Sequence, residues 1–394
     1  MKKLSQTHQK HILNLMIKKS ILLICLSVFL FGCQTDQDKN KTLLFVGSFT
    51  DKKPGDGIYV YEFDLETGEA HLKNTIDTLT NTSFLKLSPN GKYLYSVADS
   101  QMKYNGKIAA FKVDVSKSKL AFINTQDCGG VNPAHLEIDK SGNYLTNSNY
   151  SDGSLSLFKL NKNGSLSKSL QVLRFKDSSI VKNRQASSHI HSSNFTSDGN
   201  YLFAQDLGAD KIRKFTLDTL HKKLKQQQEI KTKPGSGPRH FTFHPNEKFG
   251  YLVNELSGKI NAYHYENGNL NFIEEYNSYQ KKQDIYRAAD IHISPDGKFL
   301  YASNRGPEED TIVIFSIDKK TGKLKLVGHQ QTFGAHPRNF GIDASGTFLL
   351  VANMHTNRVV IFKRNKETGK LTKLSNEISV HNPSSIQIKT YNLY

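Results

Sequence analysis

The chain has 394 residues, of which 37% are hydrophobic and 23% are charged, with 10 Pro and no Trp. This composition fits one large globular domain or two ordinary ones, and it excludes a largely disordered chain. The formal net charge is +17. The lysines are scattered through turns and do not follow one helix face. The charge therefore indicates a solvated basic surface that can attract an anionic small molecule, and we expect no nucleic-acid partner.

The first 33 residues have the pattern of a secretory leader, in which two lysines precede the apolar run ILLICLSVFLFG. The four residues LFGC that end at Cys33 resemble a bacterial lipobox. We expect residues 1–33 to be a lipoprotein-type signal peptide, with Cys33 as the lipidation site and residues 34–41 as a polar tether. The protein would then be extracytoplasmic, in the periplasm or at the cell surface of a bacterium, and anchored to the membrane by lipid. An ordinary signal peptide, an uncleaved anchor and a start at Met16 are alternatives.

Removal of the leader would leave Cys33 and Cys128 as the cysteines of the mature chain. With Cys33 lipidated, we expect no intramolecular disulfide. Cys128 is then most simply a small buried side chain, and a reactive thiol is the alternative.

One phrase recurs along the chain at intervals of 48 to 57 residues. Its copies are PNGKYLY at 89–95, KSGNYLT at 140–146, SDGNYLF at 197–203, PNEKFGY at 245–251, PDGKFLY at 295–301 and ASGTFLL at 344–350. A period near 50 indicates a repeated supersecondary unit.

Each copy predicts a hairpin whose turn is of type I character, followed by a third strand with alternating apolar residues, such as DTIVIFSID, and a fourth strand after a turn such as TGKL. Four antiparallel strands per unit are typical of a β-propeller blade. LLFVGSF at 43–49 adds a seventh second strand, and NPSSIQI at 382–388 supplies its missing first strand. We predict an all-β, seven-bladed β-propeller over residues 42–394, closed by its N- and C-terminal segments.

The first strands of a propeller line its central channel, and polar side chains recur at one end of them. Cross-strand pairing predicts three facing pairs there, which are Arg239 with Glu255, His191 with Asp206, and Arg338 with Asn353. Arg305 ends a further second strand at the same end. Arginines with a few histidines and one glutamate suit an anionic, oxygen-rich small molecule. A structural salt bridge and a structural strand-end Asn are the alternatives.

Two short motifs invite other interpretations. The HIH stretch puts His189 and His191 on one strand face, which can indicate a metal site, but no third ligand is evident. The glycines of PGSGPRHFTFHP, residues 234–245, are only weakly a phosphate cradle because no GK[ST] follows. We expect no metal and no cofactor, and we interpret His240 and His244 as structural.

The phrases HIHSSNFTSDGNYLFAQDLGADKIRKF, PGSGPRHFTFHP, YLVNEL, ADIHISPDGKFLYASNRG and HPRNFGIDASGTFLLVANM resemble the seven-bladed propeller lactonases. That family includes one bacterial type of 6-phosphogluconolactonase and the fungal carboxy-cis,cis-muconate cyclases. WD40 and Kelch repeats fit poorly, because the first needs Trp and the second a glycine pair. The resemblance implies a catalytic site at His191, Arg239, Glu255 and Arg305. From their place at the same rim, we expect His189, Asp206, Arg338 and Asn353 to bind substrate.

The resemblance implies a hydrolase that opens a sugar lactone, 6-phospho-D-glucono-1,5-lactone or a related aldonolactone, to the acid. Water would attack the ring carbonyl with Glu255 or His191 as general base, while Arg239 stabilises the oxyanion. Arg305 with Arg338 would hold a phosphate or carboxylate. The leader is a departure from the family's cytosolic members, and a phosphorylated intermediate of cytosolic metabolism does not match that location. A carboxymuconate-type cyclase and a non-catalytic, surface-tethered binding propeller are the alternatives. We expect a monomer.

Overall fold

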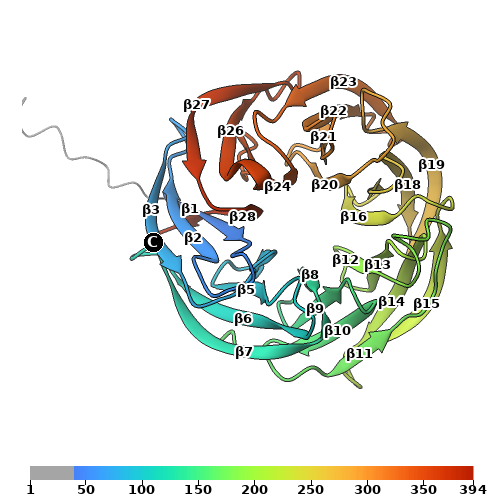
Figure 1. The fold of residues 1–394 in the computed structure, drawn as a ribbon, viewed down its shortest axis with the longest axis horizontal. Helices are drawn as coiled ribbons and strands as arrows, with labels where there is room; N and C mark the ends of the chain where they lie inside the picture. Colours follow the sequence, from blue (N-terminus) through green and yellow to red (C-terminus); the bar gives the residue numbers. More distant parts are fainter. Residues whose placement is uncertain (1–39, 394) are drawn as a thin grey trace, which may run out of the picture. The chain divides into compact units, whose positions relative to one another are not determined.

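The computed structural model describes residues 40–393, which form seven four-stranded antiparallel sheets arranged around a central channel (Figure 1). This confirms the predicted seven-bladed, all-β propeller. The predicted signal peptide, Cys33 and residues 34–39 of the predicted tether lie outside the described residues. Within residues 40–393, no helix is long and apolar enough to cross a membrane.

Each blade runs from an innermost strand at the channel to an outermost strand at the rim. Blade 1 comprises β28 (Pro383–Asn392), β1 (Asn40–Ser48), β2 (Ile58–Phe63) and β3 (Ala70–Ile76). Blade 2 comprises β4 (Leu85–Leu87), β5 (Tyr93–Ala98), β6 (Asn105–Asp114) and β7 (Lys119–Val131). Blade 3 comprises β8 (Pro133–Ile138), β9 (Tyr144–Asn149), β10 (Ser154–Lys159) and β11 (Gln171–Arg174). Blade 4 comprises β12 (Ile190–Phe195), β13 (Tyr201–Asp206), β14 (Lys211–Asp218) and β15 (Lys223–Lys231).

The remaining blades follow the same order. Blade 5 comprises β16 (Pro238–Phe243), β17 (Phe249–Asn254), β18 (Lys259–Glu266) and β19 (Asn269–Asn277). Blade 6 comprises β20 (Ala288–Ile293), β21 (Phe299–Asn304), β22 (Thr311–Ile317) and β23 (Leu324–Gln331). Blade 7 comprises β24 (Pro337–Ile342), β25 (Phe348–Asn353), the 3₁₀ turn η1 (Met354–Thr356), β26 (Arg358–Arg364) and β27 (Leu371–Ser379).

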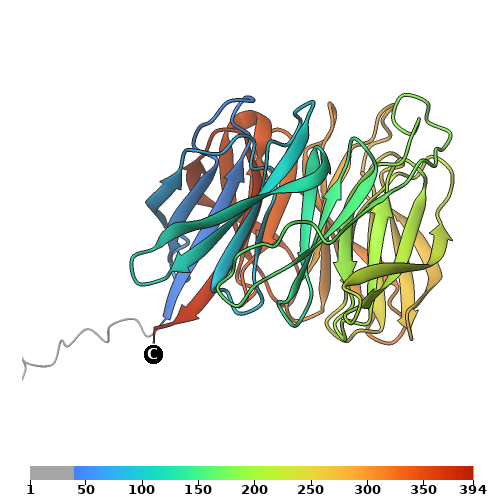
Figure 2. The same ribbon diagram turned by 90° about the horizontal axis from the view of Figure 1, so that it is seen from below.

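The ring closes through blade 1, where β28 supplies the innermost strand beside β1 (Figure 2). The hydroxyls of Thr42 and Thr390 are 2.8 Å apart, and the Ser384 hydroxyl donates to the Gly47 carbonyl at 3.2 Å. The predicted closure is therefore confirmed. β1 begins at Asn40, two residues before the expected start of the propeller, and Lys41 pairs with the carboxylate of Glu62 in β2 at 2.9 Å.

Apolar side chains from facing sheets form one hydrophobic cluster between each pair of neighbouring blades, as in the cluster that joins blades 5 and 6. The aromatic residue of the repeated phrase, Phe249 in blade 5, packs against the glycine of the TGKL turn in the next blade. A Cβ on Gly322 would lie 2.3 Å from the Phe249 ring, so only glycine fits this approach. Two residues on, the Tyr251 hydroxyl donates to the Gly322 carbonyl at 2.9 Å. These contacts explain why both phrases recur together.

Cys128 is fully buried, and its thiol contacts the Gly130 carbonyl at 3.0 Å. Burial raises the pKa of this thiol to about 12. The side chain is a small buried residue, as predicted, and the alternative of a reactive thiol is not supported.

The hairpin turn of the repeated phrase needs a residue in the left-handed region. Gly199 occupies this position in blade 4 with φ of 74°, whereas Glu247 occupies it in blade 5 with φ of 63°. A side chain makes this conformation unfavourable by about 1 kcal/mol. The Glu247 side chain is exposed. We therefore expect Glu247→Gly to increase the free energy of unfolding by up to about 1 kcal/mol, measured by urea denaturation.

Gly199→Ala is the matched control, because a Cβ at Gly199 would meet nothing within 4 Å. Its expected loss of about 1 kcal/mol would come from backbone conformation alone. Equal stability of wild type and both variants would contradict this account of the turn.

Candidate active site

A β-bulge near the beginning of the innermost strand shapes the channel end in five of the described blades. At each bulge the register between the innermost and second strands shifts, and the side chain at the shift is re-aimed. The residues skipped in pairing are Ala134, His191, Arg239, Ala289 with Asp290, and Arg338. Three of these skipped residues, His191, Arg239 and Arg338, belong to the predicted site.

The bulges change the predicted cross-strand pairs by one residue. Asn254 faces Pro238, Asp206 faces Ile190, and Asn353 faces Pro337. The predicted pairing was wrong because simple alternation does not allow for an extra residue in one strand.

A cavity of about 140 Å³ lies at this end of the channel. It contains four of the residues predicted for the site, together with polar side chains from loops of blades 2, 3 and 4. Its lining residues are Gln101, Asn132, Ala134, Tyr150, Arg184, His191, Glu255, Arg305 and Arg338.

Glu255 is the centre of the charge arrangement, and its side chain is buried. Its Oε2 accepts from Arg239 Nε at 2.9 Å and from Arg305 Nη2 at 3.1 Å, while its Oε1 accepts from Arg184 Nη2 at 2.6 Å. Burial alone would raise the pKa of Glu255, but Arg305, Arg239 and Arg184 hold it well below its usual range. The carboxylate is therefore ionised and fully engaged, which makes it a weak proton acceptor.

Arg239 lies behind Glu255 and is almost completely buried. Its Nη1 donates to the Ala289 carbonyl at 2.5 Å, so two of its nitrogens are used inside the protein. Burial, with a further contribution from Arg305, lowers the pKa of Arg239 to about 9. The residue adds positive charge next to the cavity and fixes the carboxylate, but it does not line the cavity.

Arg338 lines the cavity, and its guanidinium lies 5.2 Å from the centroid of the Phe49 ring. Within residues 40–393 it forms no ion pair. Burial and the charge of Arg305 lower the pKa of Arg338 to about 10, so it stays protonated at neutral pH. It is the arginine most available to a bound anion.

His191 lines the same cavity from the bulge of β12, and its Nδ1 is buried without a hydrogen-bond partner among the described residues. Burial, and then the charge of Arg239, lower the pKa of His191 well below its usual value. The imidazole is therefore neutral at pH 7. Among the described residues that line this cavity, His191 is the one histidine.

The two imidazoles of the HIH stretch do not converge on one point. His189 Nδ1 lies 2.7 Å from the Tyr150 carbonyl, and its ring stacks on the Tyr150 ring with centroids 4.5 Å apart. His189 therefore supports a wall residue and does not itself line the cavity.

Two other residues predicted to bind substrate also lie away from the cavity lining. Asp206 accepts from Arg213 Nε at 3.0 Å inside a buried ion-pair network. Asn353 donates through Nδ2 to the Thr332 carbonyl at 3.0 Å, which ties a loop to the strand end. Both contacts are structural, so the structure does not bring these two side chains to the cavity.

Next to the cavity, a second buried histidine packs against His191. The rings of His191 and His240 have centroids 5.1 Å apart, and His240 Nδ1 lies 2.7 Å from Asp290 Oδ1. His292 Nε2 lies 2.9 Å from the other oxygen of Asp290. His240 is thus a neighbour of the site, which strand alternation did not indicate. His244 lies at the far turn and contacts the Gly297 carbonyl at 2.8 Å, consistent with its predicted structural role.

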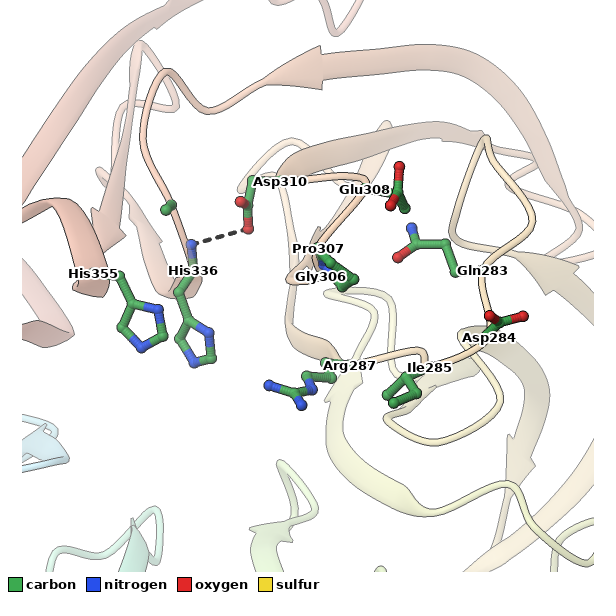
Figure 3. A pocket seen from close by; sticks show the side chains of 11 residues that line it. Gln283, Asp284, Ile285, Arg287, Gly306, Pro307, Glu308, Asp310, His336 and His355 are labelled. Atoms are coloured by element: carbon green, nitrogen blue, oxygen red, sulfur yellow. Dashed lines mark hydrogen bonds between the residues drawn. The ribbon is translucent and has the colours of Figure 1, made fainter.

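A larger cavity of about 590 Å³ adjoins the site on the side of blades 6 and 7 (Figure 3). Arg305 separates the two cavities, since its Nε donates to the Arg287 carbonyl at 2.9 Å and its Nη1 lies 3.3 Å from His336 Nε2. Burial, and then the charges of Arg305 and Arg338, lower the pKa of His336 to about 2, so its ring is neutral and accepts from Arg305.

Arg184, Tyr150 and His336 were not predicted as site residues. Arg184 lies in the long connection between β11 and β12, outside the repeated phrases, so no periodic signal identified it. His336 immediately precedes β24 in the HPRN phrase, and its adjacency to the predicted Arg338 was the signal that could have found it.

The family model described as "Lactonase, 7-bladed beta-propeller" matches residues 43–388. The chain belongs to the propeller lactonase family. This lactonase is 60% identical over 351 residues to the 6-phosphogluconolactonase of Formosa agariphila, an alignment that covers 88% of this chain and 99% of the relative. It is 32% identical to the 6-phosphogluconolactonase of Bacillus subtilis, with coverage of 88% and 98%.

Among solved structures, the lactonase is similar to the periplasmic gluconolactonase of Pseudomonas aeruginosa. The TM-score is 0.83 for a Bacteroides fragilis structure at 37% identity and 0.82 for the Pseudomonas protein at 31% identity. The alignments cover 90% and 89% of this chain and 99% of each of the two structures. The resemblance inferred from the sequence is confirmed.

The depressed pKa of Glu255 links the stability of the lactonase to pH. A carboxylate whose folded pKa lies below its unfolded value of about 4.5 stabilises the fold above that value, and the contribution is lost as the pH falls toward the folded pKa. Because Glu255→Gln leaves three arginines without their carboxylate, we expect it to lower the free energy of unfolding at pH 7 by about 3 kcal/mol. Urea denaturation from pH 7 to pH 3 measures the difference.

The difference in the free energy of unfolding between wild type and Glu255→Gln should become smaller below about pH 4. At that pH the wild-type carboxylate begins to lose its contribution to stability. A matched control is Glu377→Gln, which alters ion pairs with Arg358 and Lys373 on the outside of blade 7. Exposed ion pairs contribute about 1 kcal/mol or less to the free energy of unfolding, so the stability of this control variant should fall only slightly. A pH-independent difference would contradict the depressed pKa of Glu255.

Proposed function

We propose that this lactonase hydrolyses a sugar 1,5-lactone to the open aldonic acid, using the cavity between His191, Glu255 and Arg338. The observation that carries the proposal is that one cavity is lined by a neutral His191 and by Arg338, which forms no ion pair within residues 40–393. The first can accept a proton and the second can bind negative charge. The Formosa relative, which is named a 6-phosphogluconolactonase, supports the same reaction type.

In the proposed mechanism, the His191 imidazole accepts a proton from water as the water oxygen attacks the lactone carbonyl carbon. Negative charge then develops on the former carbonyl oxygen. That charge partly offsets the field of the arginines, which raises the proton affinity of His191 during the step. The bond from the carbonyl carbon to the ring oxygen breaks, and His191 returns its proton to that oxygen. The product is the open-chain acid.

We assign stabilisation of the oxyanion to Arg338, with Arg305 beside it, because both line the cavity. The sequence favoured Arg239 for this role, but Arg239 is buried behind Glu255 and donates to the protein through Nε and Nη1. We therefore propose Arg239 as a positioning residue. Glu255 likewise orients the arginines, since its two oxygens already accept from three guanidinium groups.

The decisive experiment compares Arg338→Met with wild type on glucono-1,5-lactone and 6-phosphoglucono-1,5-lactone, after subtraction of spontaneous hydrolysis. Loss of a charged oxyanion donor should lower kcat by about 100- to 1,000-fold. His191→Gln should lower kcat by at least about 100-fold. Arg358→Met, which changes an arginine on the outside of blade 7, is the control and should keep wild-type rates.

Wild-type rates for both site variants would show that the cavity is not the site of hydrolysis. If wild type opens neither lactone but converts a carboxymuconate, the cyclase alternative replaces the lactonase proposal. Binding of a glycan without turnover of any of these compounds would favour the non-catalytic binding propeller.

We further propose that the protein is extracytoplasmic and anchored through lipid on Cys33. The lipobox-like LFGC pattern and the similarity to a periplasmic gluconolactonase support this location. An unphosphorylated aldonolactone matches such a compartment better than a phosphorylated one.

The anchor is tested by expression of the full chain in a bacterium and separation of membrane and soluble fractions. We expect wild type in the membrane fraction and Cys33→Ala in the soluble or unprocessed fraction, because the thiol that carries the lipid is gone. Cys128→Ala, which changes a buried thiol inside the propeller, should stay with the membrane. A mature Cys33→Ala protein that remains in the membrane would contradict lipidation at this residue.

A further inference from the structure

Gln283 is one of the residues that line the 590 Å³ cavity next to the site, and the fold leaves its amide group unsatisfied. Gln283 is only 7% exposed, and neither its Nε2 nor its Oε1 has a hydrogen-bond partner among the described residues. A buried amide without partners is costly, so such a group is expected where a ligand supplies the missing hydrogen bonds. One amide donates and accepts at once, which is the pattern that neighbouring hydroxyl groups match.

The backbone beside Gln283 keeps space for this amide. A Cβ at Gly306 would lie 2.7 Å from Gln283 Oε1, so a larger residue would displace it. Figure 3 shows Gln283, Asp284 and Glu308 at one end of the cavity and His336 with His355 at the other. The two imidazole rings stack with centroids 4.1 Å apart. Polar side chains thus line the cavity at both ends.

The charge of this cavity is opposite to that of the lactone site. Asp284, Glu308 and Asp310 line it against one arginine, Arg287, and the pKa of His336 is too low for that ring to carry charge. Carboxylates accept hydrogen bonds from hydroxyl groups but repel phosphate and carboxylate ligands. The cavity therefore suits a neutral polyhydroxylated ligand.

Arg305 lies between the two cavities, because it lines the smaller one and contacts Arg287 and His336, which line the larger one. A ligand in one cavity is consequently next to a ligand in the other. The volume of about 590 Å³ lies within the range of about 300–1,000 Å³ that is typical of small-molecule sites, whereas the lactone cavity of about 140 Å³ is much smaller. A substrate limited to the smaller cavity would leave the larger one unused.

We propose that the larger cavity is a second subsite that binds a neutral glycosyl unit attached to the lactone ring, so that the substrate is a disaccharide or longer aldonolactone. The proposal rests on the proposed lactonase function, because the lactone ring must occupy the cavity of His191 and Arg338. Gln283 hydrogen-bonds hydroxyl groups of the glycosyl unit, and the acidic side chains exclude a phosphorylated one.

The test measures kcat/KM of the full propeller on glucono-1,5-lactone and on the lactones of lactobionic, maltobionic and melibionic acids, which differ in glycosidic linkage. We expect at least one disaccharide lactone to be preferred over gluconolactone by tenfold or more. Gln283→Leu should reduce that preference about tenfold, because two hydrogen bonds are lost. His355→Ala, at the exposed far wall, should also reduce it. Gln228→Leu, the same change on the outer strand of blade 4, should leave the preference unaltered.

Calorimetric titration with the corresponding aldonic acids separates the two proposals. If gluconolactone is hydrolysed but no disaccharide lactone is preferred, the subsite proposal is overturned and the lactonase proposal stands. If no lactone is hydrolysed, the lactonase proposal fails. The binding affinities of the aldonic acids then test the subsite proposal by themselves. Tighter binding of a disaccharide acid than of gluconate, weakened by Gln283→Leu, would support it, and equal affinities would overturn it.

Discussion

Closure of the ring by hydrogen bonding between β28 and β1 is the constraint on which the candidate site depends. The side chains around the small cavity come from six blades, and no single blade supplies more than a few of them. Their mutual distances are therefore set by the ring and not by local chain geometry. A propeller whose first blade lacked its innermost strand would leave the hydrogen-bonding edge of β1 unpaired at the channel. The last strand of the chain thus contributes to the site without supplying a residue to it.

Within that ring, the bulges of the innermost strands turn selected side chains toward the channel mouth. The same irregularity places neutral His191 in one blade and charged Arg338 in another. The positive charge gathered there is tolerable because Glu255 accepts from three guanidinium groups. A buried carboxylate in this setting organises the arginines, and it has no free lone pair of comparable basicity for proton transfer. The proposed mechanism therefore assigns proton transfer to His191 and charge stabilisation to Arg338, which forms no ion pair within residues 40–393.

The two adjoining cavities differ in the charge of their lining side chains. The smaller one is cationic and matches a reaction that produces a carboxylate. The larger one is acidic and contains the unsatisfied amide of Gln283, which matches hydroxyl groups. Arg305 is the wall between them and is held from both sides, so its position couples the shapes of the two cavities. The fold thereby places an anion-binding region directly beside a region that disfavours anions.

The sequence by itself determined the architecture, because a blade-sized period and alternating apolar strands depend on local chain geometry. It also indicated which end of the blades carries the polar residues, and it brought Arg239 together with Glu255, a contact that the structure contains at 2.9 Å. Tertiary structure alone decided which of these side chains reach the cavity, because each bulge shifts the strand alternation by one residue. In the folded chain Asp206 pairs with Arg213 inside a buried network and does not reach the cavity. Arg184, from a loop outside the repeated phrases, pairs with Glu255 at the cavity. The contact between Arg184 and Glu255 joins a loop before blade 4 to blade 5, so its geometry depends on how neighbouring blades pack in the ring.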